Sequence, residues 1–197
     1  MESRGIRNNN PLNIRHSADR WIGARIAQTD PGFVQFVSMA YGYRAAWKVL
    51  ESYWKHFKRQ RLPFTVAGII ARWAPPNENH TEAYVRTVLN LTSLGGHENL
   101  PRPFTGIAID KLVRLLAAMT TVECGIPYKE VDTEAIWEGY ELAFPGKLGA
   151  QIPDGKNLGS PIVESPFRID LPAEMEDCRH LDEYWDWSPE AFSPLSS

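Results

Sequence analysis

Residues 43–60 repeat their large apolar side chains at the spacing of an α-helix, and this segment limits the possible fold more than any other. The apolar set lies on one face of a 3.6-residue period, and it consists of Tyr43, Ala46, Trp47, Leu50, Tyr53, Trp54 and Phe57. Such a stripe predicts a helix that is buried along one side. Because a long amphipathic helix needs partners to cover its apolar face, we expect the chain to form a helical body.

Further helices are predicted from apolar periods bounded by caps and stops. The segments are 65–73, 82–94, 109–124 and 133–144. Expected N-caps are Thr65, then Thr81 or Asn79, then Asp132 or Thr133, and the expected stops are Gly95-Gly96, Gly125 and Pro145. Residues 1–40 are rich in Asn, Gly and Pro, and they predict loops with short strands at 24–28 and 33–37 around the turn Asp30-Pro31-Gly32. We therefore predict a mainly α (α+β) fold with a small N-terminal β-region.

Charge is divided unevenly along the 197 residues, which together carry a net charge of −3. Residues 1–163 hold 19 basic and 15 acidic residues, whereas residues 164–197 hold 2 basic and 9 acidic residues. After Phe144 the chain is rich in Pro and Gly and shows no helical period, so we predict a folded domain over residues 1–144 and an extended, Pro-rich acidic tail over residues 145–197. The acidic and aromatic cluster Glu183–Trp187 suits docking on the basic stretch Lys55–Arg61 or on another protein. That basic stretch is equally compatible with a solvated helix end.

Composition also excludes several classes of function. The slightly acidic net charge argues against a general nucleic-acid binder, and no apolar run approaches the ~20 residues of a membrane helix. The N-terminal residues lack the apolar core of a signal peptide, so export through that route is not expected. The five histidines have no metal-binding spacing, and no nucleotide-binding loop occurs. We therefore expect no metal, no cofactor, no nucleic acid and no membrane partner.

Two Asn-rich motifs are the most informative polar segments. Arg4–Arg15 reads R-G-I-R-N-N-N-P-L-N-I-R, and Trp73–Tyr84 reads W-A-P-P-N-E-N-H-T-E-A-Y. Asn side chains shape loops by bonding to local backbone, and their amides also suit sugar hydroxyls and acetamido groups. Aromatic faces beside amides are typical of carbohydrate clefts. The candidate glycan-binding residues are Asn9, Asn10, Asn13, Trp73, Asn77, Asn79 and Tyr84, and the alternative is that both motifs only form structured connections. We expect the two motifs to meet at one groove.

Glu123 is the candidate catalytic residue because it continues an apolar stripe. The stripe of segment 109–124 includes Leu112, Leu116 and Met119, and four positions further lies Glu123, in the last helical turn. Burial and the negative end of the helix dipole both favour a protonated carboxyl group, so we predict a pKa above the usual ~4.3. A carboxyl kept protonated near neutral pH is what the general acid of a glycosidase requires. The alternative is a Glu that points into solvent at a frayed helix end.

Taken together, these motifs resemble a family of bacteriophage and prophage virion proteins. The resemblance rests on Arg4–Arg15, Trp21-Ile22-Gly23, Phe33–Phe36 with Gly42–Ala45, Trp73–Tyr84 and Glu123-Cys124-Gly125, and it spans about residues 4–144. Members of this family are usually described as phage structural proteins. The resemblance implies a protein of the virion, present in the host bacterial cytoplasm before assembly, with virion proteins as partners of the acidic tail.

The chain also resembles, more weakly, lysozyme-like glucosaminidases and lytic transglycosylases. Asn9–Ile14 is similar to an Asn-rich segment of those enzymes, Trp73–Tyr84 is similar to a late loop, and Glu123 stands at a helix end as their catalytic Glu does, although in a permuted order. This resemblance implies a lysozyme-like domain that binds and cleaves peptidoglycan glycan strands, with Glu123 as general acid/base and Glu78 as the second candidate. The alternative is a non-enzymatic virion structural or accessory protein on the same scaffold.

Overall fold

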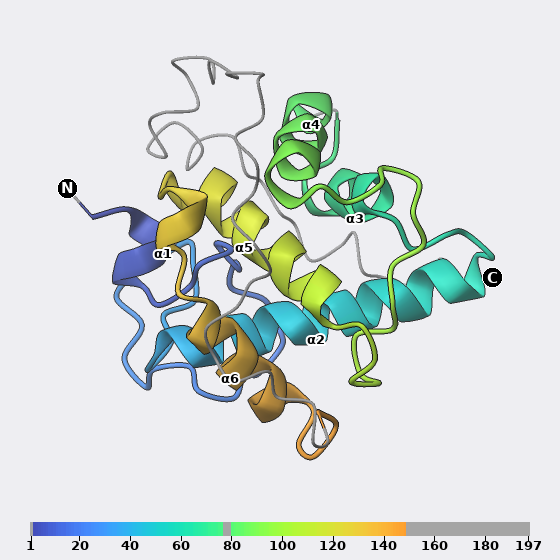
Figure 1. The fold of residues 1–197 in the computed structure, drawn as a ribbon. Coiled ribbons are helices and arrows are strands. Elements are labelled where there is room, and N and C mark those ends of the chain that lie inside the picture. Colours follow the sequence, from blue (N-terminus) through green and yellow to red (C-terminus); the bar gives the residue numbers. More distant parts are fainter. Residues whose placement is uncertain (1, 77–79, 149–197) are drawn as a thin grey trace.

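The computed structural model describes residues 2–76 and 80–148, and these residues form a mainly helical body (Figure 1). In chain order the helices are α1 (Arg4–Arg7), α2 (Met39–Arg59), α3 (Val66–Trp73), α4 (Thr81–Thr92), α5 (Asp110–Cys124), the 3₁₀-helix η1 (Tyr128–Glu130) and α6 (Thr133–Ala143). The predicted tail lies outside the described residues from position 149 onward, as do Asn77, Glu78 and Asn79. None of the helices in the described ranges is long and apolar enough to cross a membrane.

The long helix α2 is the centre of the packing, as its apolar stripe predicts. Helix α6 lies along its N-terminal half, and α5 belongs to the same core (Figure 1). The Trp47 indole N–H donates to the Ile136 carbonyl at 3.0 Å, and the Trp47 ring meets the Tyr140 ring edge-on with centroids 5.0 Å apart. Trp47 and Tyr140 are fully buried, so the indole N–H needs this carbonyl to avoid an unpaired donor in the core.

Several predicted helix boundaries are confirmed by their caps. The Thr65 side chain accepts from the Gly68 amide at the start of α3, and the Asp132 side chain accepts from the Ala135 amide at the start of α6. Gly125 ends α5 in the left-handed conformation, with φ of 64°, which glycine adopts without strain. Helix α4 ends earlier than predicted, because Ser93 rather than Gly95-Gly96 takes the left-handed turn.

The expected N-terminal strands do not form within the described residues. The segment contains the short helix α1 and two isolated antiparallel bridges, Arg15 with Phe33 and Ala24 with Phe36. The physical reason is that side-chain amides share the pairing with the backbone. The Asn10 amide nitrogen donates to the carbonyl groups of Ile14 and Val34, each at 2.8 Å, beside the backbone bond from the Val34 amide to the Ile14 carbonyl at 2.9 Å.

Asp30 fixes the turn that carries the second of these segments. Its carboxylate accepts two hydrogen bonds from the Arg4 guanidinium at 2.7 Å, one from the Asn8 amide at 2.8 Å, and one each from the Gly32 and Phe33 backbone amides at 3.0 Å. Burial alone would raise the pKa of Asp30, but these donors outweigh burial and hold the pKa well below its usual range. The Asn motif is therefore attached to the 30–36 segment mainly by polar contacts.

Gly42 allows the same motif to approach α2 closely. A Cβ atom at this position would lie 2.1 Å from the Asn9 carbonyl oxygen and 2.7 Å from the Pro11 ring. Real Cβ atoms do not approach backbone this closely, so only glycine fits here. This contact positions the end of the Asn motif over the helical body, where the candidate site lies.

Candidate functional site

Glu123 lies in the last turn of α5 and is 1% exposed, so its predicted burial is confirmed. The residue continues the apolar stripe of α5 into a polar pocket. A buried carboxylate is stable only where hydrogen-bond donors compensate for lost hydration. The geometry around its two oxygens therefore decides what the group can do.

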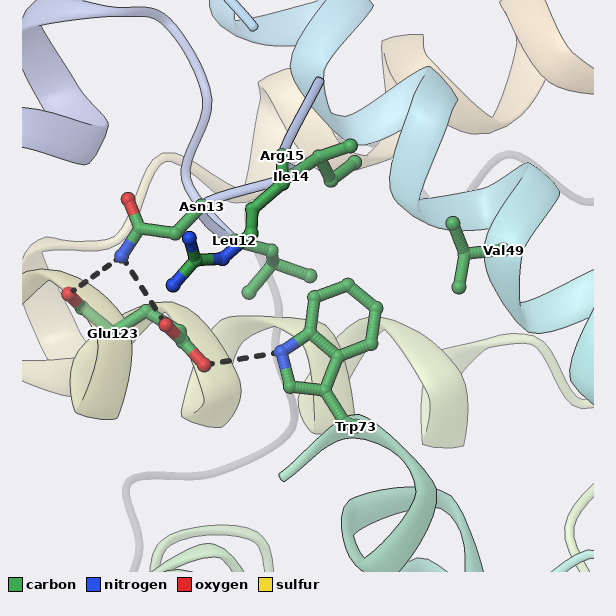
Figure 2. A pocket seen from close by; sticks show the side chains of 7 residues that line it. All are labelled: Leu12, Asn13, Ile14, Arg15, Val49, Trp73 and Glu123. Carbon is green, nitrogen blue, oxygen red and sulfur yellow. Dashed lines mark hydrogen bonds between the residues drawn. The ribbon is translucent and has the colours of Figure 1, made fainter. Parts of the chain in front are cut away.

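Among the described residues, three donors converge on this carboxylate from three separate segments, and Figure 2 shows two of them, Asn13 and Trp73. The Trp73 indole N–H and the Tyr84 hydroxyl donate to Oε1 at 3.1 and 3.0 Å, and the Asn13 amide nitrogen donates to Oε2 at 3.2 Å. Trp73 ends α3, Tyr84 lies in α4 and Asn13 belongs to the N-terminal motif. The two Asn-rich motifs therefore meet at Glu123, as the sequence predicts.

Asn13 is held by an unusual local conformation. Its φ is 47°, in the left-handed region that Asn tolerates better than most residues, and its backbone N–H donates to the Asn10 carbonyl at 3.0 Å. Its amide nitrogen also lies 3.4 Å from the Glu123 carbonyl oxygen, whereas its own Oδ1 is buried with no hydrogen-bond partner among the residues the structure describes. The amide therefore presents its donor side to Glu123 and leaves its acceptor unused.

The two aromatic donors, Trp73 and Tyr84, are buried and are not accessible to a ligand at the surface. Trp73 is 6% exposed and Tyr84 3% exposed, and the Tyr53 ring meets the Trp73 ring edge-on at 6.2 Å. Burial, and the negative charge and hydrogen bond of Glu123, raise the pKa of Tyr84 well above its usual value of about 10. The hydroxyl of Tyr84 thus remains protonated and acts as a fixed donor.

A small cavity of about 20 Å³ opens beside the carboxylate. Its lining consists of Leu12, Asn13, Ile14, Arg15, Val49, Trp73 and Glu123 (Figure 2). This volume accommodates about one water molecule, since a water needs ~10–15 Å³. The cavity is thus large enough for a nucleophilic water beside Glu123 but too small for a sugar ring in this conformation.

The other predicted site residues have different places. Asn10 is fully buried, and both atoms of its amide bond to backbone, since its Oδ1 also accepts from the Ile14 amide at 2.8 Å. The Asn9 amide donates to the Phe36 carbonyl at 3.1 Å, and Asn9 adopts φ of 50°. In this conformation both residues shape the loop that presents Asn13. Asn77, Asn79 and Glu78 lie outside the described residues.

Sequence reasoning missed two contributions to the site. Arg15, the last residue of the Asn motif, lines the cavity, and its guanidinium lies over the Phe33 ring at 5.0 Å. Its signal was available, because the last four residues of the motif, Leu12 to Arg15, alternate apolar and polar side chains and so place Arg15 on the same side as Asn13. Val49 of α2 also lines the cavity, and only the packing of α2 against the motif reveals this. Across residues 2–76 and 80–148, no three His, Cys, Asp or Glu side chains gather as metal ligands would.

The described residues thus define a mainly helical domain in which a buried carboxylate is held between two Asn-rich motifs. No family model matches the chain. A relative comes from a bacteriophage: the chain is 34% identical over 148 residues to Protein P5 of Pseudoalteromonas phage PM2. The alignment covers 73% of this chain and 84% of that protein. The chain therefore belongs to the family of this phage protein.

Proposed function

We propose that the protein is a virion-associated phage or prophage protein that binds peptidoglycan glycan strands and cleaves them, with Glu123 as general acid/base. The observation that carries the proposal is the buried Glu123 carboxyl group, oriented by Asn13, Trp73 and Tyr84 beside a water-sized cavity. Buried carboxyl groups with fixed donors are typical of glycosidase acids. The lysozyme-like resemblance of the two Asn-rich motifs supports the same activity.

The chemistry needs one carboxyl group. Protonated Glu123 gives its proton to the glycosidic oxygen as the bond from the anomeric carbon to that oxygen breaks. A water in the cavity then attacks the anomeric carbon, and the Glu123 carboxylate takes up the proton of that water. Where the acetamido oxygen of the substrate attacks first, a water opens the resulting oxazolinium ion, and Glu123 takes up the proton of this water. Trp73 and Tyr84 keep the Oε1 atom in place, so Oε2 on the Asn13 side is the oxygen that exchanges the proton.

Substrate access requires a change of conformation near Glu123. The carboxyl group is 1% exposed, and the cavity does not admit a sugar. Trp73 ends α3 and Tyr84 lies in α4, so separation of these two helices from the N-terminal motif is the simplest route to the carboxyl group. In this proposal Asn77 and Asn79 bind the glycan, and Glu78 is the second candidate for the acid.

The test is mass analysis of the soluble products after purified peptidoglycan is incubated with the protein. Wild type is expected to release sugar fragments, and Glu123→Gln is expected to release none while remaining folded. Glu130→Gln is the matched control, because Glu130 is exposed in η1 and has no contact with the site. If Glu123→Gln keeps full activity, Glu78→Gln is tested next, and absence of cleavage by wild type on several peptidoglycans would reject the enzyme.

The burial of the site favours a second candidate, a non-enzymatic virion structural or accessory protein. Trp73 and Tyr84 contribute little surface for stacking on a sugar, and their donors to Glu123 could serve only to join α3, α4 and the N-terminal motif. Co-sedimentation with insoluble peptidoglycan separates the alternatives without requiring catalysis. Binding without release of fragments would support a wall-binding accessory role, and lack of both would leave the structural role.

A further inference from the structure

A second hollow lies at the other end of α2, between the last turns of that helix and the segment 99–102. Its volume is about 420 Å³ and it is open to solvent. Trp54, Leu62 and Phe64 contribute apolar surface, whereas Lys58 and Arg102 contribute charge. We call this hollow the Trp54 groove. It has no residue in common with the cavity beside Glu123.

Two cations gather on one aromatic ring in this groove. The Lys58 ammonium lies 5.1 Å from the centroid of the Trp54 ring, and the Arg102 guanidinium lies 5.2 Å from it. Neither cation forms an ion pair with a carboxylate of the described residues, whereas neighbouring Lys55 pairs with Glu51 at 2.7 Å. Because like charges repel, two unneutralised cations near one ring favour the binding of an anion at this groove.

The apolar surface of the groove indicates which kind of anion fits it. Leu62 is 53% exposed at the rim, and the Trp54 ring packs edge-on against Phe104 with centroids 5.2 Å apart. A free inorganic anion would leave this apolar surface uncovered. An acidic peptide with aromatic side chains would satisfy both parts, since carboxylates match the two cations and rings cover the leucine and the indole.

We propose that the Trp54 groove binds residues 181–187 of the same chain. This segment reads L-D-E-Y-W-D-W, with three carboxylates and three aromatic rings, and it belongs to the region 164–197 that carries 9 acidic and 2 basic residues. The described body is basic by comparison, so the charges are complementary. Residues 181–187 lie outside the described residues.

The reach of the chain permits docking within one molecule. The described residues end at Leu148, and 33 positions separate it from Leu181. At ~3.3–3.6 Å per extended residue these positions span up to roughly 110 Å, whereas a domain of this length has a radius of gyration of only ~15 Å. A tether of this length also gives the segment a high effective concentration at the groove, which favours the intramolecular complex over a second copy.

Zero-length carbodiimide cross-linking of the full chain tests the proposal. This reagent joins an amine to a carboxylate only where the two are in contact, and tryptic peptides identify the pair. We expect Lys58 to join Asp182, Glu183 or Asp186, with a yield that falls in 0.5 M NaCl. The exposed Lys129 of η1 is the internal reference and should form no such pair. Mixed isotope-labelled and unlabelled chains show whether each pair lies within one molecule.

Matched variants determine whether the groove itself is responsible. Arg102→Gln should lower the Lys58 yield by at least about fivefold, which corresponds to ~1 kcal/mol of docking free energy. Arg86→Gln removes one exposed cation on α4 and should leave the yield unchanged, and Lys58→Arg should abolish the cross-link. The proposal is overturned if Lys58 gives no cross-link to residues 181–187, if Arg102→Gln behaves like Arg86→Gln, or if the pairs join different molecules. It is independent of the function proposed for Glu123.

Discussion

Replacing Glu123 by Gln or by Ala separates the hydrogen-bonding role of this side chain from its charge. Gln keeps the shape and offers its amide oxygen to Trp73 and Tyr84, which donate to Oε1. Its amide nitrogen then faces the Asn13 amide nitrogen. A half-turn of the Asn13 amide relieves this conflict, because it brings the buried and unused Oδ1 toward Gln, but it also gives up the 3.4 Å contact of the amide nitrogen with the carbonyl oxygen of residue 123. Ala removes every acceptor at once.

The size of the two effects follows from the number of orphaned donors. Glu123→Ala removes the acceptor of three buried donors, at ~1–3 kcal/mol each, and water entering the enlarged cavity offsets part of the loss. We expect a net loss of about 3–5 kcal/mol, which lowers the melting temperature by roughly 6–20 °C for a domain of this size. Glu123→Gln removes a buried charge and keeps the acceptor of Trp73 and Tyr84, so it should stay within ~1 kcal/mol of wild type at neutral pH, or exceed it.

Thermal unfolding followed by circular dichroism at pH 7 measures both variants. Glu130→Ala serves as the surface control and should change the free energy of unfolding by less than ~0.5 kcal/mol. Two results would refute the reasoning: a Gln variant as unstable as the Ala variant, or an Ala variant as stable as wild type. The first would mean that a neutral amide oxygen does not replace the carboxylate, and the second that the three donors do not depend on an acceptor at position 123.

Three further predictions concern the scaffold and the tail. Gly42→Ala gains ~1 kcal/mol of helix propensity but places a Cβ atom 2.1 Å from the Asn9 carbonyl oxygen. We therefore expect the free energy of unfolding, measured in urea, to fall by ~1–3 kcal/mol. An unchanged urea midpoint would contradict this packing. Burial raises the pKa of Asp30, but its hydrogen-bond donors outweigh burial and lower the pKa. The Asp30 carboxylate therefore stabilises the fold at pH above its unfolded pKa of ~3.9, and this contribution is lost as the pH falls through the lower pKa of the folded state. The stability gap between wild type and Asp30→Asn should therefore be widest near neutral pH and narrow below pH ~4, and a gap constant with pH would exclude this account. Truncation before Glu164 should shift the melting temperature by only a few degrees, because the described residues between Leu12 and Leu148 already form a hydrophobic core. If the truncated chain unfolds, the tail is part of the core and this prediction is wrong.

The helices were predictable because their signals are local. The apolar stripe of residues 43–60 and the caps at Thr65, Gly125 and Asp132 depend only on neighbours within one or two turns. The burial of Glu123 followed from the same periodicity. These predictions hold because tertiary packing in a helical body stabilises the same helices that the local sequence already favours.

The N-terminal region was harder to predict because side-chain amides share the pairing with a few backbone bonds there. Alternation of residue type predicts strands at 24–28 and 33–37, but it does not reveal that the Asn10 amide holds Ile14 and Val34 together. Likewise Trp73 was expected to offer its face to a ligand, and instead it donates to Glu123. The contact between Asn13 and Glu123 spans 110 positions, and no local pattern reports a contact at that separation.

The cost of burying a carboxylate bears directly on function. Three segments of the fold each supply one donor to Glu123, and a neutral Gln would accept from Trp73 and Tyr84 as well, with less desolvation. Gln would therefore serve a purely structural role at two of the three donors, and the stability of Glu123→Gln measures how far structure alone explains the carboxylate. If Glu123→Gln proves at least as stable as wild type, stability does not explain the residue, and the property that Gln lacks is the ability to give and take a proton.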